Sequence, residues 1–229
     1  MTRPSEVSLL EGLATTRAIR RYSSDPIPDD DLSRILWSAT RAPSGSNRQP
    51  FRFLVLRDGN RAREAKALLG RAFRAGWNAK KRSDGYDLVV DGGSPKARQA
   101  RAMQWYVDHF EEIPVVVLVC LVRYRDPNPY EGASVYPACQ NLLLAARALG
   151  YGGALTMWHQ AVEEELRSLL GIPEAAAVSA CITLGRPQGA HGPVRRRPVD
   201  QLVFDDAWES PAPWVVDPTG TEFTHWRNA

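Results

Sequence analysis

The sequence has little cysteine and little histidine, and this scarcity narrows the classes of protein that it can encode. Its 229 residues include three cysteines and four histidines. Cys120, Cys139 and Cys181 are odd in number, widely spaced and set in apolar surroundings, so we expect buried free thiols rather than a disulfide framework. No His-x-x-x-His or Cys-x-x-Cys pair occurs. We therefore expect no metal site.

Long hydrophobic runs are also missing. The longest apolar run, residues 113–122, is far too short for a helix that spans a bilayer, which takes about 20 residues. The first six residues contain no apolar core of a signal peptide. These observations predict a soluble, cytoplasmic protein with no membrane partner.

The sequence also lacks a large excess of positive or negative charge, and it lacks the common motifs of hydrolases and nucleotide-binding enzymes. The 29 basic and 26 acidic residues leave a net charge of +3, and no basic stripe is interleaved with aromatics, which argues against a nucleic-acid partner. There is no Gly-x-Ser-x-Gly elbow and no Walker loop. The glycines of residues 150–153 follow a predicted helix, whereas a dinucleotide fingerprint follows a strand. An enzyme with this sequence would need a cofactor to carry its reaction.

The length and composition suit one soluble domain that contains both helices and strands. Apolar spacing and flanking turn residues predict helices over residues 7–15, 29–42, 61–74, 96–110, 134–149 and 163–170. They predict strands over 51–56, 113–122 and 178–184, with a short segment at 154–157. Residues 78–95 and 123–132 are expected to be loops, and the chain from Val199 onward an extended tail that lies on another surface.

Three polar clusters are candidates for a binding site. Arg17, Arg20 and Arg21 form the first, and Arg195–Arg197 form the last. Guanidinium groups that lie so close repel one another unless an anion joins them, and arginine binds phosphate through two parallel hydrogen bonds. Between them in the sequence, residues 43–51 form a turn rich in Ser, Gly, Asn and Gln, which offers N–H, hydroxyl and amide groups to a ligand. Taken singly, the clusters could also be solvated basic faces and an ordinary helix-to-strand connection.

Four short sequence motifs follow one another along the chain in the order found in a known protein family. They are Thr-Arg-Ala-Ile-Arg-Arg-Tyr at 16–22, Ala-Pro-Ser-Gly-Ser-Asn-Arg-Gln-Pro-Phe at 42–51, Leu-Gly-Tyr-Gly through Leu-Gly-Ile-Pro at 149–173, and Arg-Arg-Arg-Pro at 195–198. In this order the chain resembles the FMN-dependent nitroreductase family, whose turn reads Ala-Pro-Ser-x-x-Asn-x-Gln-Pro-Trp. Two positions depart from the family pattern. Ala18 stands where the family usually has a phosphate-binding serine, and Thr16 stands where many members have arginine.

The resemblance implies an α+β fold in which a central, mainly antiparallel sheet is flanked by helices, as one flavin-binding domain over residues 1–229. It also implies a homodimer with intertwined extensions and with FMN at the subunit interface. The helix predicted at 134–149 is apolar on most sides and suits such an interface. The extension at 199–229 would wrap the partner.

The resemblance further implies a set of cofactor-binding residues. Arg17 would hold the FMN phosphate together with Arg195 or Arg197. Arg20 would approach the N1 and C2 carbonyl edge of the flavin, where a cation stabilises the reduced ring. The full implied set is Arg17, Ala18, Arg20, Arg21, Ser44, Asn47, Gln49, Leu155, Thr156, Arg195 and Arg197. We expect no catalytic side chain, because flavin N5 would carry the chemistry.

The implied activity is the reduction of small electron-poor acceptors, such as nitroaromatics or quinones. The reductant would be NADH or NADPH, and hydride would pass through flavin N5 in a ping-pong reaction. Residues 78–95 and 123–132 would lie on the substrate side. Two alternatives stay open: another flavin reaction on the same scaffold (dehalogenation, ene reduction or flavin breakdown), and a non-catalytic flavin-binding or storage protein.

Overall fold

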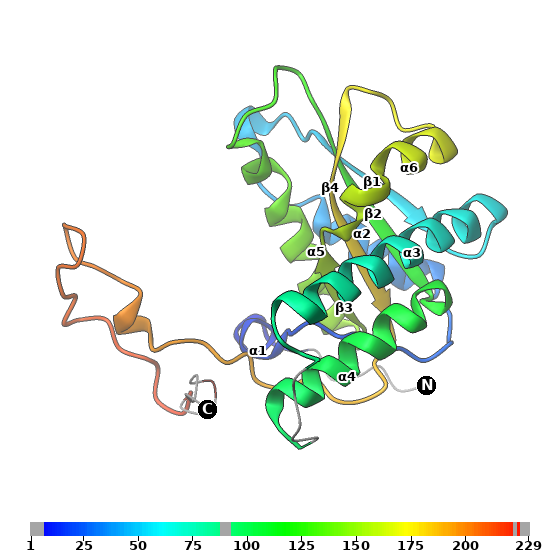
Figure 1. Ribbon diagram of the computed structural model, residues 1–229. Helices are drawn as coiled ribbons and strands as arrows, with labels where there is room; N and C mark the ends of the chain where they lie inside the picture. Colours follow the sequence, from blue (N-terminus) through cyan, green and yellow to red (C-terminus); the bar gives the residue numbers. More distant parts are fainter. Residues whose placement is uncertain (1–6, 88–92, 222–223, 225–229) are drawn as a thin grey trace.

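An antiparallel sheet of four strands forms the centre of the fold (Figure 1). The computed structural model describes residues 7–87, 93–221 and 224. The strands are β1 (Phe51–Leu56), β2 (Val115–Val122), β3 (Gly152–Thr156) and β4 (Ala176–Gly185), in the spatial order β1-β2-β4-β3. Each neighbouring pair of these strands is antiparallel. This arrangement confirms the predicted α+β architecture.

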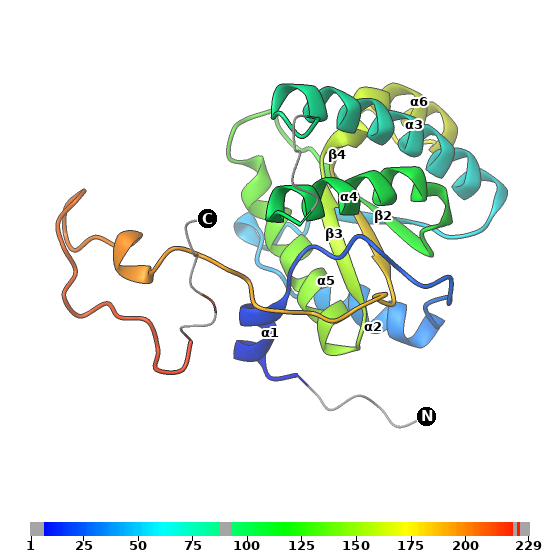
Figure 2. The same cartoon turned by 60° about the horizontal axis from the view of Figure 1, so that its bottom comes forward.

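Helices lie on both faces of the sheet (Figures 1 and 2). The α-helices in the described residues are α1 (Leu9–Thr15), α2 (Asp29–Ala39), α3 (Asn60–Ser83), α4 (Pro95–Asp108), α5 (Tyr136–Ala148) and α6 (Glu163–Leu170). Within the described part of the chain, no helix is long and apolar enough to cross a membrane.

The central strand β2 explains why both faces are covered. Alternate side chains of a strand point to opposite faces of its sheet. Val116 and Leu118 join the apolar cluster formed with α3, α4 and α6, whereas Val117 and Val119 join the cluster formed with α2 and α5. All four are fully buried. The continuous apolar run of this strand therefore predicted its burial on both faces correctly.

The helix α3 is longer than the predicted 61–74, which corrects part of the loop predicted over 78–95. It continues to Ser83. Trp77 is 1% exposed, and its indole N–H donates to the Gln104 side chain of α4 (3.0 Å). This contact with α4 stabilises the last turns of α3. Their sequence is basic and polar and lacks the regular apolar spacing by which a helix is predicted. Residues 88–92 of the predicted loop lie outside the described residues.

The segment predicted only as a short piece at 154–157 belongs to strand β3. Its partner β4 pairs with it from Gly152 opposite Gly185 to Thr156 opposite Cys181. Glycine has low strand propensity, but here close approach requires it. A Cβ at Gly153 would lie 2.6 Å from the Thr183 carbonyl oxygen. The glycines thus weaken the sequence signal for this strand, although close packing against β4 requires them.

A buried polar network fastens the segment before α2 to the sheet. Thr183 Oγ1 of β4 lies 2.8 Å from the Tyr22 hydroxyl and 3.1 Å from the Tyr106 hydroxyl of α4. The Tyr22 hydroxyl also contacts the Ile19 carbonyl. Burial raises the pKa of Tyr22 and of Tyr106, so both remain neutral. The network links the backbone next to Arg20 with β4 and α4.

Replacing Thr183 by valine is expected to lower the free energy of unfolding by about 1–3 kcal/mol, because two buried tyrosine hydroxyls lose a partner. Denaturant titration followed by circular dichroism measures this change. Tyr106→Phe is the control, since it removes one hydroxyl and keeps the bond between Tyr22 and Thr183. It should cost less than Thr183→Val. Equal stability of Thr183→Val and the wild type would show that the network contributes nothing.

The chain from Val199 to Thr221 extends away from the sheet and its helices (Figures 1 and 2). It contains one 3-10 turn, Val199–Gln201, and otherwise no helix or strand in its described residues. Trp208 is 84% and Trp214 69% exposed. The extended shape matches the sequence expectation, and contact with a partner remains a prediction.

Candidate functional site

The first and last arginine clusters lie side by side because two segments far apart in the sequence pair with each other (Figure 2). Tyr22 and Pro187 form an antiparallel bridge. The amide of Gln188 donates to the Arg21 carbonyl (3.0 Å), and the amide of Val194 donates to the Ala14 carbonyl (2.8 Å). Residues 16–22 therefore run antiparallel to residues 187–194.

The same segment also lies against the outer edge of the sheet. The Ile19 amide donates to the Gly153 carbonyl of β3 at 2.9 Å, and a Cβ at Gly152 would lie 2.5 Å from the Ile19 side chain. Leu155 and Thr156, expected near the flavin, follow on this strand, and Leu155 is 38% exposed. The structure thus brings β3 close to the first arginine cluster.

These segments and helix α4 line an open, arginine-rich cavity of about 950 Å³. None of the described residues that line it is acidic. Its cationic lining consists of Arg17, Arg20, Arg21, Arg98, Arg195 and Arg196. Ala18 also lines it, whereas Arg197, expected beside the phosphate, is not among the lining residues and Arg196 is. A cavity with this charge is suited to a ligand that carries phosphate.

One further group in the cavity wall favours a polar ligand. The Thr16 hydroxyl is buried in the cavity wall without a hydrogen-bond partner, which is a costly state for a polar atom. The neighbouring Arg17 donates to the Ala190 carbonyl (3.3 Å). Burial, reinforced by the positive charges of Arg147 and Arg17, lowers the pKa of His191. The described lining therefore combines several guanidinium groups with a hydroxyl that has no hydrogen-bond partner.

The polar turn at residues 43–51 is backbone-strained. Ser46, Asn47 and Gln49 have φ angles of 51°, 52° and 48°, a left-handed conformation that non-glycine residues rarely adopt. Side chains hold it in place: the Ser44 hydroxyl accepts from the Gln49 amide (2.9 Å), and the Gln49 side-chain amide donates to Asn47 Oδ1 (3.3 Å). Strain of this kind persists where the surroundings determine the conformation, and it is concentrated at functional sites.

One chain does not bring the turn and the arginine cavity together. The Gly45 amide donates to the Ser134 hydroxyl (3.1 Å), just before the N-terminus of α5. The cavity side lies beyond the other end of this helix, where His191 Nε2 is 3.1 Å from the Tyr151 carbonyl oxygen. The 13 residues of α5 separate the two by about 20 Å. Ser44, Asn47 and Gln49 therefore open onto a different surface from Arg17 and Arg195.

Sequence reasoning missed Arg98 and Gln99, which α4 contributes to the cavity. Arg98 and Arg101 are both exposed arginines of this helix, and no local motif distinguishes Arg98 from Arg101. Arg21 reaches the same helix, because its guanidinium lies over the Trp105 ring at 5.5 Å. Only the packing of α4 against the sheet reveals these neighbours.

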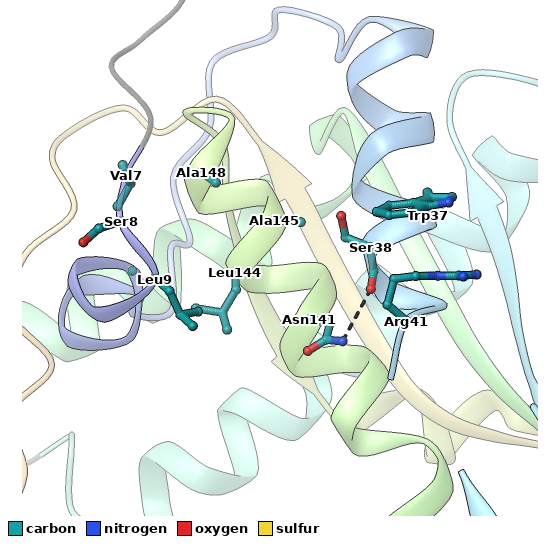
Figure 3. A pocket seen from close by; sticks show the side chains of 11 residues that line it. Val7, Ser8, Leu9, Trp37, Ser38, Arg41, Asn141, Leu144, Ala145 and Ala148 are labelled. Carbon is teal, nitrogen blue, oxygen red and sulfur yellow. Dashed lines mark hydrogen bonds between the residues drawn. The ribbon is translucent and has the colours of Figure 1, made fainter. Parts of the chain in front are cut away.

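A second, apolar hollow of about 360 Å³ lies between α1, α2 and α5 (Figure 3). Trp37 and Leu144 line it, and the Asn141 side-chain amide donates to the Ser38 carbonyl (3.4 Å) at its edge. Around it Leu9 is 69%, Leu10 77% and Trp37 63% exposed. An apolar face of this kind marks a surface for protein–protein contact.

Comparison with known proteins agrees with these features. The model of the family described as "Nitroreductase family" matches residues 13–186. A protein of Archaeoglobus fulgidus, whose name pairs NADH dehydrogenase with NAD(P)H nitroreductase, is 32% identical over 184 residues, covering 78% of this chain and 85% of its own. Iodotyrosine deiodinase 1 of Rattus norvegicus is 27% identical over 204 residues, covering 84% and 67%.

Solved structures share the fold. A protein of Desulfovibrio desulfuricans, described as a nitroreductase in complex with FMN, superposes with a TM-score of 0.62 at 26% identity. The match covers 87% of this chain and 96% of that one. The arrangement of helices around the sheet is therefore shared over most of both chains.

Proposed function

The chain belongs to the nitroreductase family, and from that premise we propose that it is an FMN-dependent oxidoreductase. It uses NADH or NADPH to reduce electron-poor small molecules such as nitroaromatics or quinones. The observation that carries this proposal is the arginine-rich cavity with the unpaired Thr16 hydroxyl in its wall. FMN binds in the D. desulfuricans relative.

The residues present suit the FMN phosphate. Arg17 and Arg195 come from the two paired segments and supply guanidinium groups from both sides. The Thr16 hydroxyl supplies a donor in place of the missing serine hydroxyl at Ala18. Arg20 would face the flavin ring and favour negative charge on it. When bound, the flavin supplies the hydride chemistry that the side chains of this chain lack.

A second copy of the chain would complete the site. Ser44, Asn47 and Gln49 lie roughly one α5 length away from Arg17 in the same chain. Contact between two copies through the exposed apolar face of α1, α2 and α5 would cover Leu9, Leu10 and Trp37. We place the polar turn of one copy over the arginine cavity of the other. Each site is then built from two chains, and bound FMN links them.

A second reaction on this scaffold is supported by similarity to iodotyrosine deiodinases. The rat iodotyrosine deiodinase is similar over 84% of this chain. Reductive dehalogenation would use the same phosphate and flavin contacts and differ only in the groups that surround the acceptor. Turnover of halogenated phenols compared with nitroaromatics separates the two reactions.

Purification followed by an absorbance spectrum and a titration with NADPH and NADH tests the proposal. We expect a yellow protein, or a colourless one that takes up FMN, whose flavin absorbance bleaches on reduction. An added nitroaromatic should restore the colour and sustain continued NAD(P)H oxidation. Stoichiometric bleaching without turnover on any acceptor would indicate a flavin store. A protein that takes up no FMN would refute the proposal.

A further inference from the structure

The arginine cavity carries more positive charge than one FMN phosphate can use. Six guanidinium groups line it and none of its described lining residues is acidic. A phosphate monoester carries about −1.5 to −2 charges at neutral pH, and two arginines can pair with it bidentately. After Arg17 and Arg195 are assigned to FMN, as the proposed function has it, further cations remain without a counter-ion in the lining. A cleft lined by one sign of charge attracts a ligand of the opposite charge, so this surplus favours the binding of a second anionic group.

Two of the remaining cations, Arg98 and Arg21, lie at helix α4. Arg98 occupies the first turn of α4, where its guanidinium donates to the Gly93 carbonyl and Ser94 caps the helix. Arg21 is directed toward the same helix by Trp105, whose ring stacks on His109 with centroids 4.3 Å apart. Arg98 and Trp105 are seven residues apart and so share one face of α4. This face forms a second basic wall.

We propose that Arg98 and Arg21 bind the 2′-phosphate of NADPH and make this chain prefer NADPH to NADH. The inference rests on the proposed function and sharpens it, because it chooses between the two reductants. NADPH differs from NADH by one phosphate monoester, which is the chemistry that a surplus pair of arginines recognises. Gln99, beside Arg98 in the lining, adds an amide donor to the same wall.

Binding of nucleotide fragments tests this site without turnover. Calorimetry on the FMN-loaded protein at low salt compares 2′,5′-ADP with 5′-AMP, which lacks the 2′-phosphate. The wild type should bind 2′,5′-ADP at least about tenfold more tightly, and Arg98→Ala should lose most of that difference. In kinetics, the same variant should lower kcat/KM for NADPH about tenfold and leave that for NADH within twofold.

Matched variants separate recognition from general charge. Arg101→Ala removes the same charge from α4 at a position outside the cavity lining, and it should leave the ratio of the two fragments unchanged. Arg98→Lys keeps the charge without the planar fork and should retain part of the preference. FMN affinity should be the same in Arg98→Ala and the wild type.

Three results would overturn the inference. They are equal binding of the two fragments to the wild type, an unchanged preference in Arg98→Ala, and a loss of FMN in Arg98→Ala as large as its loss of 2′,5′-ADP. The last result would assign Arg98 to the FMN phosphate. Failure of the proposed function is distinguishable, since a chain that takes up no FMN can still be titrated with both fragments. Active enzyme without a preference refutes the NADPH site alone.

Discussion

Replacing Arg17 and Arg195 together by alanine is expected to weaken FMN binding by about a hundredfold or more and to leave riboflavin binding nearly unchanged. The two residues stand on paired segments that line one cavity. Charge-assisted hydrogen bonds to phosphate are stronger than hydrogen bonds between neutral groups. Riboflavin has no phosphate, so its binding does not depend on these bonds. The variant should therefore lose affinity for FMN and keep its affinity for riboflavin.

Calorimetric titration of the apoprotein with FMN and with riboflavin measures this effect. A control with Arg61 and Arg71 replaced by alanine removes the same two charges from exposed positions of α3 outside the cavity lining. This control should bind FMN about as tightly as the wild type. An equal loss of affinity for both flavins in the Arg17 and Arg195 variant would show that the two arginines support the fold and not the phosphate.

Mixing two inactive variants is expected to restore FMN binding if the site is shared between two copies. One variant carries Arg17→Ala and Arg195→Ala, and the other carries Ser44→Ala and Asn47→Ala. A mixed dimer would contain one site in which both contributions are intact and one in which both are lost. With random pairing, about a quarter of all sites should regain tight FMN binding and activity.

Co-expression with two affinity tags isolates the mixed dimer, and FMN content with NADPH oxidation measures recovery. Each variant paired with itself is the matched control and should remain without tight binding. If both clusters belonged to a site within one chain, every chain in the mixture would carry a defect and no site would recover. The absence of recovery in an isolated mixed dimer would therefore refute the shared site.

The elements that the sequence predicted well are those whose signals are local. The helix at 163–170 has acidic residues at its start and Gly171, with φ of 67°, at its end, and its bounds match α6. The run at 113–122 is apolar throughout and became the central strand β2. Propensity, capping and burial agree in both segments, so neighbouring residues suffice to predict them.

The elements that the sequence predicted poorly depend on distant partners. The last turns of α3 are held by Trp77 and its bond to Gln104, 27 residues away. Strand β3 has a glycine-rich sequence, and it is held at the edge of the sheet by pairing with β4 and by packing against Ile19. In both cases tertiary contacts override local propensity.

The candidate site shows the same division. The arginines at 17, 20, 21 and 195, and the polar turn at 43–51, were named from composition and motif order alone. Arg98 was missed, and Arg196 lines the cavity where Arg197 was expected. Local sequence indicates neither position, because whether a given arginine faces a cavity depends on the exact path of the backbone, and the roles of Arg195 and Arg197 stay predictions.

The sequence by itself determined the family, the alternation of helices and strands, and the chemical character of each polar cluster. These properties reside in short stretches, where turn chemistry, charge and periodicity act between near neighbours. The tertiary structure alone decided which clusters meet. Arg17 donates to Ala190 across 173 residues, whereas Asn47, much nearer in sequence, lies at the far end of α5. The physical reason is that proximity follows from strand pairing and helix length and not from distance along the chain.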